Sequence, residues 1–213
     1  PNARIMNLYG LSESSGACIC SPLEDDVERL MDERGIPLLG IPLDDYEIRI
    51  VDDEGNPLPD GEVGEIAVKG DCVCNGYIGL EDKTKEAFKG DWLLTGDLGY
   101  KKGNFVYFMG RKNEMYIQAG YNVYPAEIEN VLLTHPKVYM VAVIGVKGEF
   151  YREKGVAYVI PKGEVSEREL KEYCAKYIAD YKIPKEFIFV NSLPLTPAGK
   201  IQKSELLKIY EGK

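Results

Sequence analysis

Hydrophobic and polar positions along the first half of the chain follow a pattern typical of β-strands. In residues 46–51, Ile48 and Ile50 lie two positions apart and therefore share one face of a strand. Residues 62–69 are also rich in strand-forming side chains, and residues 104–109 are rich in aromatic ones. Glycine- and proline-containing turns separate these segments. Short strands joined in this way predict a small barrel or sandwich.

The second half alternates strand and helix. Pro125 suits the first turn of a helix, where its missing N–H is not needed, and apolar residues follow at helical spacing. The run 138–146 is almost continuously apolar, which predicts a central strand covered on both faces. Residues 155–160 predict a further strand. Ser166 and the glutamate three residues later form a capping box for a helix whose apolar positions repeat as far as Ile178.

Near residue 110 the predicted pattern changes from short strands joined by loops to alternating strands and helices. We therefore predict an α+β chain in two parts, with a small β-rich, barrel-like part over 1–110 and an α/β domain over 111–213.

Composition narrows the functional classes. The 213 residues are 45% hydrophobic and 29% charged, as in a folded protein, and the formal net charge of −9 argues against a nucleic-acid partner. No apolar stretch approaches the roughly 18 residues of a membrane-spanning helix. No positively charged start is followed by an apolar core, so we expect no signal peptide, and the sequence begins at Pro1 rather than at methionine. We expect a cytoplasmic protein, of which this chain is a piece.

Five cysteines are too few for a disulfide scaffold in a chain of this size, and an odd number cannot all pair within one chain. Cys18 and Cys20 are two positions apart, as are Cys72 and Cys74, and this spacing would place each pair on one face of a strand. A zinc site is conceivable, but zinc ligands usually have two to four intervening residues, and His135 is the only histidine. We interpret the thiols as small apolar residues packed in sheets.

Four polar, glycine-containing segments interrupt the predicted elements. Segment 7–13 follows a short apolar strand and offers an aromatic ring, backbone N–H groups and a carboxylate, which suits a nucleotide with its Mg²⁺, although Tyr-Gly turns are common without function. Asp97 follows a glycine turn and can accept hydrogen bonds from a ribose diol or close its own turn. Segment 110–122 contains Arg111, which can pair with phosphate or ribose oxygens or bridge two domains.

The fourth segment, 194–200, holds two prolines and a glycine before Lys200. This composition predicts a stiff, exposed loop that holds the lysine away from the body of the protein. Most surface lysines are only solvated.

In this order, the four segments resemble the adenylate-forming superfamily, which includes acyl-CoA synthetases, luciferases and peptide-synthetase adenylation domains. The resemblance covers nearly the whole chain and includes the framework segments 61–66, 75–77 and 124–129. It implies that residues 111–213 form a mobile lid domain that carries a catalytic lysine.

The resemblance also implies roles for single residues. Tyr9 would stack on adenine beside Gly10, Ser12 would bind near the α-phosphate or the acyl carboxylate, and Glu13 would hold Mg²⁺. Ser12 stands where threonine is usual in the family, and it keeps the hydroxyl.

Further matches extend to the C-terminal end. They imply a ribose-binding Asp97, a ribose-contacting Arg111, a hinge at Lys112 and Asn113, a Gly120 loop that approaches the pantetheine of CoA, and a catalytic Lys200. Asn113 stands where aspartate or lysine is usual.

The implied reaction converts a small carboxylic acid, ATP and CoA into acyl-CoA, AMP and pyrophosphate through an acyl-adenylate. Segments 181–185 and 199–203 resemble fatty and aryl acyl-CoA synthetases more than peptide synthetases. The glycine-rich phosphate loop and most of the acyl pocket would lie in a missing N-terminal part of the same chain, so we expect the isolated chain to be inactive. The alternatives are an adenylation domain, an aryl-CoA or acyl-AMP ligase of the same superfamily, and a non-catalytic binding module.

Overall fold

The computed structural model describes residues 3–24, 26–148 and 153–212. The chain divides into two compact units, Pro1–Asn113 and Glu114–Lys213, which we call unit 1 and unit 2 and describe separately. The division falls after Asn113, whereas the sequence pattern placed it after Gly110.

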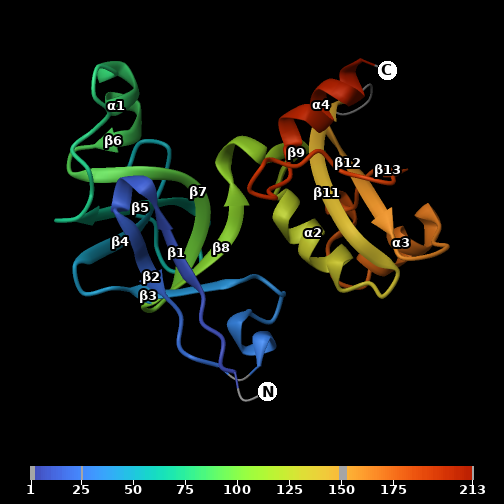
Figure 1. The fold of residues 1–213 in the computed structure, drawn as a ribbon, viewed down its shortest axis with the longest axis horizontal. Helices are drawn as coiled ribbons and strands as arrows, with labels where there is room; N and C mark the ends of the chain where they lie inside the picture. Colours follow the sequence, from blue (N-terminus) through green and yellow to red (C-terminus); the bar gives the residue numbers. More distant parts are fainter. Residues whose placement is uncertain (1–2, 25, 149–152, 213) are drawn as a thin grey trace. The chain divides into compact units, whose positions relative to one another are not determined.

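Unit 1 is built on one eight-stranded sheet, whose hydrogen-bonded order is β1-β2-β3-β8-β7-β5-β4, with β6 paired to β7 (Figure 1). The strands are β1 (Leu8–Leu11), β2 (Gly16–Cys20), β3 (Leu38–Pro42), β4 (Tyr46–Val51), β5 (Gly64–Gly70), β6 (Phe88–Lys89), β7 (Trp92–Lys102) and β8 (Phe105–Arg111). All of these pairs are antiparallel. Within the described residues, the pairing path begins at β1 and ends at β4.

The strands expected in the first half are confirmed. β4 has the expected bounds, and β5 and β8 lie within two residues of theirs at each end. Ile48 and Ile50 both face the core of unit 1, where they meet Ile66, Val68 and Val106. The alternation of the sequence therefore reports one buried face of a sheet.

Short helical segments of unit 1 were not expected. They are α1 (Glu81–Ala87) and three 3₁₀ turns, η1 (Ser12–Ser14), η2 (Val27–Leu30) and η3 (Lys112–Glu114), the last of which runs one residue into unit 2. No residue of α1 is buried, so this helix has no apolar stripe that a sequence pattern could reveal.

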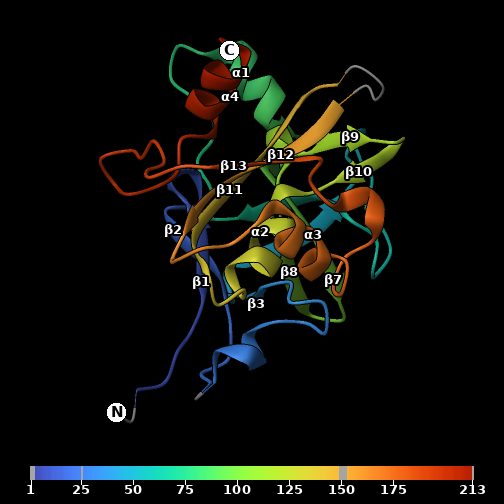
Figure 2. The ribbon, with the colours of Figure 1, turned by 90° about the vertical axis from the view of Figure 1, so that its right-hand side faces the viewer.

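Unit 2 contains a three-stranded sheet with helices on both faces. Its elements are the hairpin β9 (Tyr116–Gln118) and β10 (Tyr121–Val123), α2 (Pro125–Leu133), β11 (Val138–Lys147), β12 (Glu153–Pro161), α3 (Glu167–Cys174), η4 (Asp180–Lys182), β13 (Glu186–Phe189) and α4 (Lys203–Glu211). The sheet order is β11-β12-β13, with β12 and β13 parallel. Residues of α2 and α3 pack on one face of the sheet, and Leu206 of α4 packs on the other. Figure 2 shows these helices beside the strands of unit 2.

Two expectations for unit 2 need correction. β11 is buried on both faces, as the apolar run predicted, but it is an edge strand, and β12 is central. A continuous apolar run reports burial of both faces and not the number of hydrogen-bonded neighbours. The helix that Ser166 caps ends at Cys174, and Tyr177 is exposed beyond it.

Candidate functional site

Three residues that the sequence proposed for nucleotide binding meet in unit 1. The hydroxyl of Tyr9 donates a hydrogen bond to Oδ2 of Asp97 over 2.7 Å. Nε of Arg111 lies 3.1 Å from Oδ1 of the same carboxylate. Asp97 is buried, with 3% of its surface exposed, whereas the Arg111 side chain is 56% exposed. We call these three residues the Asp97 cluster.

Strand geometry positions each member of the cluster. Asp97 on β7 is the cross-strand partner of Arg111 on β8. The carboxylate therefore contacts side chains of two other strands. Tyr9 lies inside β1, whereas the sequence placed it after a strand. Burial, followed by the nearby charge of Asp97, raises the pKa of Tyr9, so its phenol remains a proton donor.

Gly10 has a packing role in this structure. A Cβ atom at this position would lie 1.9 Å from the carbonyl oxygen of Gly16 on the paired strand β2. Glycine is required there because the two backbones approach closely.

The next motif residues lie on η1. Ser12 is exposed and Glu13 is half-buried. The hydroxyl of Tyr77 donates to Oε1 of Glu13 over 2.8 Å, and the N–H of Cys74 donates to the Glu13 carbonyl over 2.8 Å. The hydrogen bond between the Tyr77 hydroxyl and the Glu13 carboxylate is the main reason that the pKa of Tyr77 is raised. Sequence reasoning missed the Tyr77 contact, although segment 75–77 was among the framework motifs.

The cysteines do not form a cluster. All five are free, Cys18 is buried on β2, and Cys72 and Cys74 lie outside strands, contrary to the expectation for this pair. Among the described residues, no group of three or more His, Cys, Asp and Glu side chains is placed to hold a metal ion.

The proposed hinge lies beside the Asp97 cluster in sequence. Nζ of Lys112 is 2.8 Å from Oε2 of Glu65 and 2.8 Å from Oδ1 of Asp53. Asn113 is the last residue of unit 1. A hollow of about 300 Å³ is lined by Gly96, Arg111, Lys112 and Asn113. Sequence reasoning missed Glu65, a buried carboxylate of β5.

Gly120 and Lys200 belong to unit 2. Ala119 and Gly120 form the two-residue turn of the β9–β10 hairpin, with φ of 53° and 85°. Tight hairpin turns favour positive φ at both positions. Both residues are exposed, so the turn is an accessible tip.

Residues 197–200 of the lysine loop are exposed, as the sequence predicted, and the loop forms a tight turn. Leu195 and Ile201 form a β-bridge, and the hydroxyl of Thr196 accepts the Lys200 N–H over 3.0 Å. Gly199 has a φ of 78°. Lys200 is exposed, and within the part of the chain that the structure describes its ammonium has no ion-pair partner. The backbone is therefore ordered while the charge remains available.

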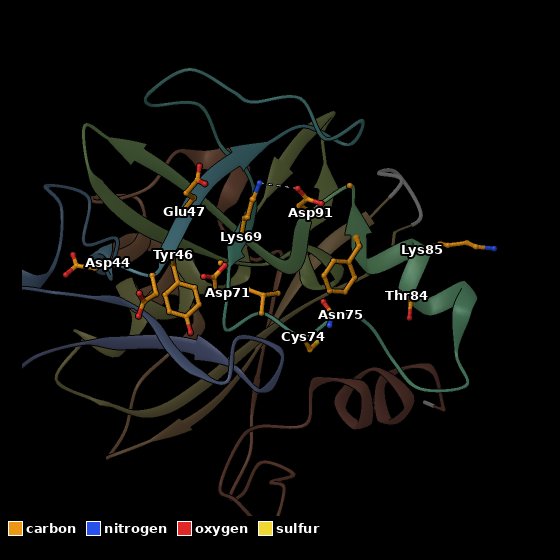
Figure 3. A pocket seen from close by; sticks show the side chains of 15 residues that line it. Asp44, Tyr46, Glu47, Lys69, Asp71, Cys74, Asn75, Thr84, Lys85 and Asp91 are labelled. Atoms are coloured by element: carbon orange, nitrogen blue, oxygen red, sulfur yellow. Dashed lines mark hydrogen bonds and ion pairs between the residues drawn. The ribbon is translucent and has the colours of Figure 1, made fainter.

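A surface cavity of about 860 Å³ lies elsewhere on unit 1 (Figure 3). Five carboxylates and two lysines line it; the carboxylates are Asp44, Asp45, Glu47, Asp71 and Asp91. Its negative charge opposes the binding of phosphate groups, and it contains no member of the Asp97 cluster.

Two family models match the chain. The model of the AMP-binding enzyme matches residues 1–78, and that of the AMP-binding enzyme C-terminal domain matches residues 127–200. The chain belongs to the AMP-binding, adenylate-forming superfamily. The first match lies within unit 1 and the second within unit 2.

Two curated relatives are CoA ligases. The 2-succinylbenzoate–CoA ligase of Bacillus mycoides is 37% identical over 208 residues, which are 97% of this chain and 42% of that protein. The sulfoacetate–CoA ligase of Cupriavidus necator is 37% identical over 207 residues, which are 95% of this chain and 39% of that protein.

Solved structures agree with this assignment. The o-succinylbenzoate CoA synthetase of Bacillus subtilis, in complex with its acyl-adenylate intermediate, matches with a TM-score of 0.85 and 34% identity, covering 95% of this chain and 41% of that one. The same enzyme has been solved with ATP and magnesium ion. The chain thus spans about two fifths of the length of these relatives. None of the described helices is long and apolar enough to cross a membrane.

Proposed function

We propose that the chain is the carboxy-terminal part of an ATP-dependent acid–CoA ligase. The intact enzyme would convert a small carboxylic acid, ATP and CoA into acyl-CoA, AMP and pyrophosphate through an acyl-adenylate. The observation that carries this proposal is the Asp97 cluster, in which an aromatic ring, a carboxylate and a guanidinium meet from three strands. These are the groups that a nucleoside needs for stacking and for hydrogen bonds to its ribose.

The first half-reaction would take place against unit 1. The ring of Tyr9 would support adenine, Asp97 would accept hydrogen bonds from the ribose hydroxyls, and Arg111 would hold the same carboxylate in place and contact the ribose. Because little covalent chemistry falls to the protein, its contribution is positioning and charge stabilisation.

Magnesium fits the motif on η1. The carboxylate of Glu13 is a hard oxygen donor, and only its Oε1 is bonded by Tyr77. Glu13 would hold the ion with Ser12 nearby, and the bound ion would neutralise phosphate charge. The Cys74 N–H and the Tyr77 hydroxyl would orient Glu13 for this task.

Lys200 and the Gly120 turn would serve different steps. The exposed ammonium of Lys200 would neutralise charge between the acid and the α-phosphate during adenylation. The accessible Gly120 turn would then approach CoA for thioester formation. A swivel at Lys112 and Asn113 would exchange the two, and the division of the chain after Asn113 supports this location.

CoA is the acceptor that the comparisons favour, because the two curated relatives named above are CoA ligases. Their acids, 2-succinylbenzoate and sulfoacetate, differ from each other and from fatty acids. The acid therefore has to be found by experiment.

The test is pyrophosphate exchange by the full-length protein across a panel of aromatic, sulfonated and fatty acids, followed by thioester formation with and without CoA. We expect exchange with at least one acid and a CoA thioester of that acid. Exchange without CoA transfer would indicate an adenylation domain or an acyl-AMP ligase. A protein that binds AMP but exchanges pyrophosphate with no acid would instead be a binding module. The isolated 213-residue chain should show little turnover, and substantial acyl-CoA formation by it would contradict the proposal.

A further inference from the structure

Glu65 on β5 touches both flanks of the Asp97 cluster. Only 6% of its surface is exposed. Its Oε1 accepts a hydrogen bond from the Gly96 N–H over 2.8 Å, and its Oε2 lies 2.8 Å from Nζ of Lys112. Gly96 directly precedes Asp97, and Lys112 directly follows Arg111. The buried carboxylate of Glu65 thus holds Gly96, the neighbour of Asp97, and Lys112, the neighbour of Arg111.

A bulge in β7 explains the contact with Gly96. Glu65 pairs with Leu98 and Ala67 pairs with Leu94, so β5 has one residue between these pairs and β7 has three. The extra residues of β7 cannot all bond to the β5 backbone, and an N–H without a partner at the partly buried Gly96 would be unfavourable. Glu65 supplies the missing acceptor at Gly96 through its side chain. The bulge, in turn, is what presents Asp97.

Lys112 balances the buried charge of Glu65. A buried carboxylate is costly unless a cation and hydrogen bonds accompany it. Burial by itself lowers the pKa of Lys112, but the carboxylates of Asp53 and Glu65 outweigh this and the pKa is raised. Lys112 therefore stays charged. Asp53 is the exposed partner, with 82% of its side chain accessible, and Glu65 is the buried one.

We propose that Glu65 is a positioning residue for recognition of the ribose of ATP, which acts through Gly96 and Lys112 on Asp97 and Arg111. This inference rests on the proposed function. Glu65 would act without touching the nucleotide. Its loss should therefore weaken discrimination between ATP and analogues that lack a ribose hydroxyl more than it slows adenylation itself.

The test compares kcat/KM of the full-length protein for ATP, 2′-deoxyATP and 3′-deoxyATP in pyrophosphate exchange. A site that bonds a hydroxyl rejects analogues that lack it. We expect Glu65→Ala to reduce the preference for ATP by about tenfold or more, because the hydrogen bonds at stake involve a charged group. Glu65→Gln keeps an oxygen for the Gly96 N–H and should lose less of the preference. Asp53→Asn, which removes only the exposed partner of Lys112, should keep the wild-type preference.

A uniform fall with all three nucleotides would overturn the inference, because a purely structural role lowers the active fraction without changing selectivity. If Glu65→Ala does not fold, as judged by circular dichroism, Glu65→Gln decides: a reduced preference supports the inference and a wild-type preference overturns it. A wild-type protein that adenylates no acid overturns the proposed function and this inference together. An active wild type with unchanged selectivity in both Glu65 variants overturns the inference alone.

Discussion

The phenol of Tyr9 donates a 2.7 Å hydrogen bond to the carboxylate of Asp97, although 88 residues separate the two along the chain. Tyr9 lies on β1 and Asp97 on β7, and these strands are not neighbours in the sheet. The bond therefore fixes the ring and the carboxylate relative to each other across the fold. In the proposed function, the two groups that would hold the nucleoside are in place before it binds, which lowers the entropic cost of binding.

Tyr9→Phe should raise the KM for ATP about tenfold, because a hydrogen bond to a charged group contributes roughly 1.5–3 kcal/mol. The aromatic ring remains, so kcat should change less. Initial rates of pyrophosphate exchange by the full-length protein measure both constants. Tyr139→Phe is the matched control, since Tyr139 is 61% exposed on β11. An unchanged KM in Tyr9→Phe would show that the bond to Asp97 does not support nucleotide binding.

The candidate site was predictable as separate motifs but not as an arrangement. Tyr9, Asp97 and Arg111 were each identified from their segments. Their meeting depends on the strand order, which no local pattern encodes. Tyr77 and Glu65 lie in segments that carried the family resemblance, yet their contacts with Glu13 and Gly96 arise only from tertiary structure.

Lys200→Ala should slow adenylation about a hundredfold or more in the full-length protein. Opposite charges about 4 Å apart interact by roughly 4 kcal/mol at an effective dielectric constant near 20. Conversion of supplied acyl-adenylate and CoA into thioester should be spared, because the ammonium is proposed for the first step only. Rapid-quench assays of each half-reaction measure the two rates separately.

Lys208→Ala is the control for Lys200→Ala. Lys208 is also an exposed lysine near the C-terminal end, and among the described residues it pairs with Glu205 one turn away on α4. It should retain both half-reactions. Equal losses in the two half-reactions of Lys200→Ala would argue against a role specific to adenylation.

How well a fold element could be predicted depended on what its sequence pattern measures. The bounds of β4 were predicted correctly because its apolar residues alternate with polar ones, which indicates one buried face. α1 was missed because it buries nothing. The edge position of β11 was missed because α2 and α4 cover its two faces, which makes its sequence resemble that of a central strand. Hydrophobic patterns in a sequence report which faces of a helix or strand are buried. They do not report which strands pair with each other, because that depends on the tertiary fold.

Lys203→Met should destabilise unit 2 by about 1–3 kcal/mol at neutral pH, because it leaves two partly buried carboxylates without their cation. Nζ of Lys203 lies 2.8 Å from Oε1 of Glu129 and 2.5 Å from Oε2 of Glu114. Burial raises the pKa of Glu129, and Lys203 lowers it in part. Without the lysine this pKa should rise further.

The sign of the pH effect follows from that raised pKa. A carboxyl with a raised folded-state pKa contributes stability at low pH that is lost as the pH rises through that value. The deficit of Lys203→Met should therefore be larger at pH 7 than at pH 5. Urea unfolding followed by hydrogen exchange on peptides of unit 2 measures it, with the exposed Lys162→Met as control. A deficit that is equal at both pH values would contradict the role of Glu129.

Asp32→Ala should destabilise unit 1 by about 2–4 kcal/mol, because several hydrogen bonds to one charged group are lost together. The carboxylate accepts from the hydroxyl of the buried Tyr100 over 2.6 Å, from the Ile36 N–H over 2.8 Å and from Arg34 over 2.9 Å. Burial by itself raises the pKa of Asp32, but these hydrogen bonds outweigh it, and the pKa lies below its ordinary value of 3.8.

Because the folded-state pKa of Asp32 is depressed, its contribution is complete above pH 3.8 and is lost as the pH falls through the lower folded value. The gap between wild type and Asp32→Ala should be the same at pH 7 and pH 5 and should narrow at pH 3. Urea unfolding followed by the fluorescence of Trp92, the only tryptophan and a residue of unit 1, measures it. Glu33→Ala, which removes an exposed ion pair with Lys102, should leave stability unchanged. A gap that persists undiminished at pH 3 would mean that the carboxylate charge of Asp32 is not what stabilises this loop.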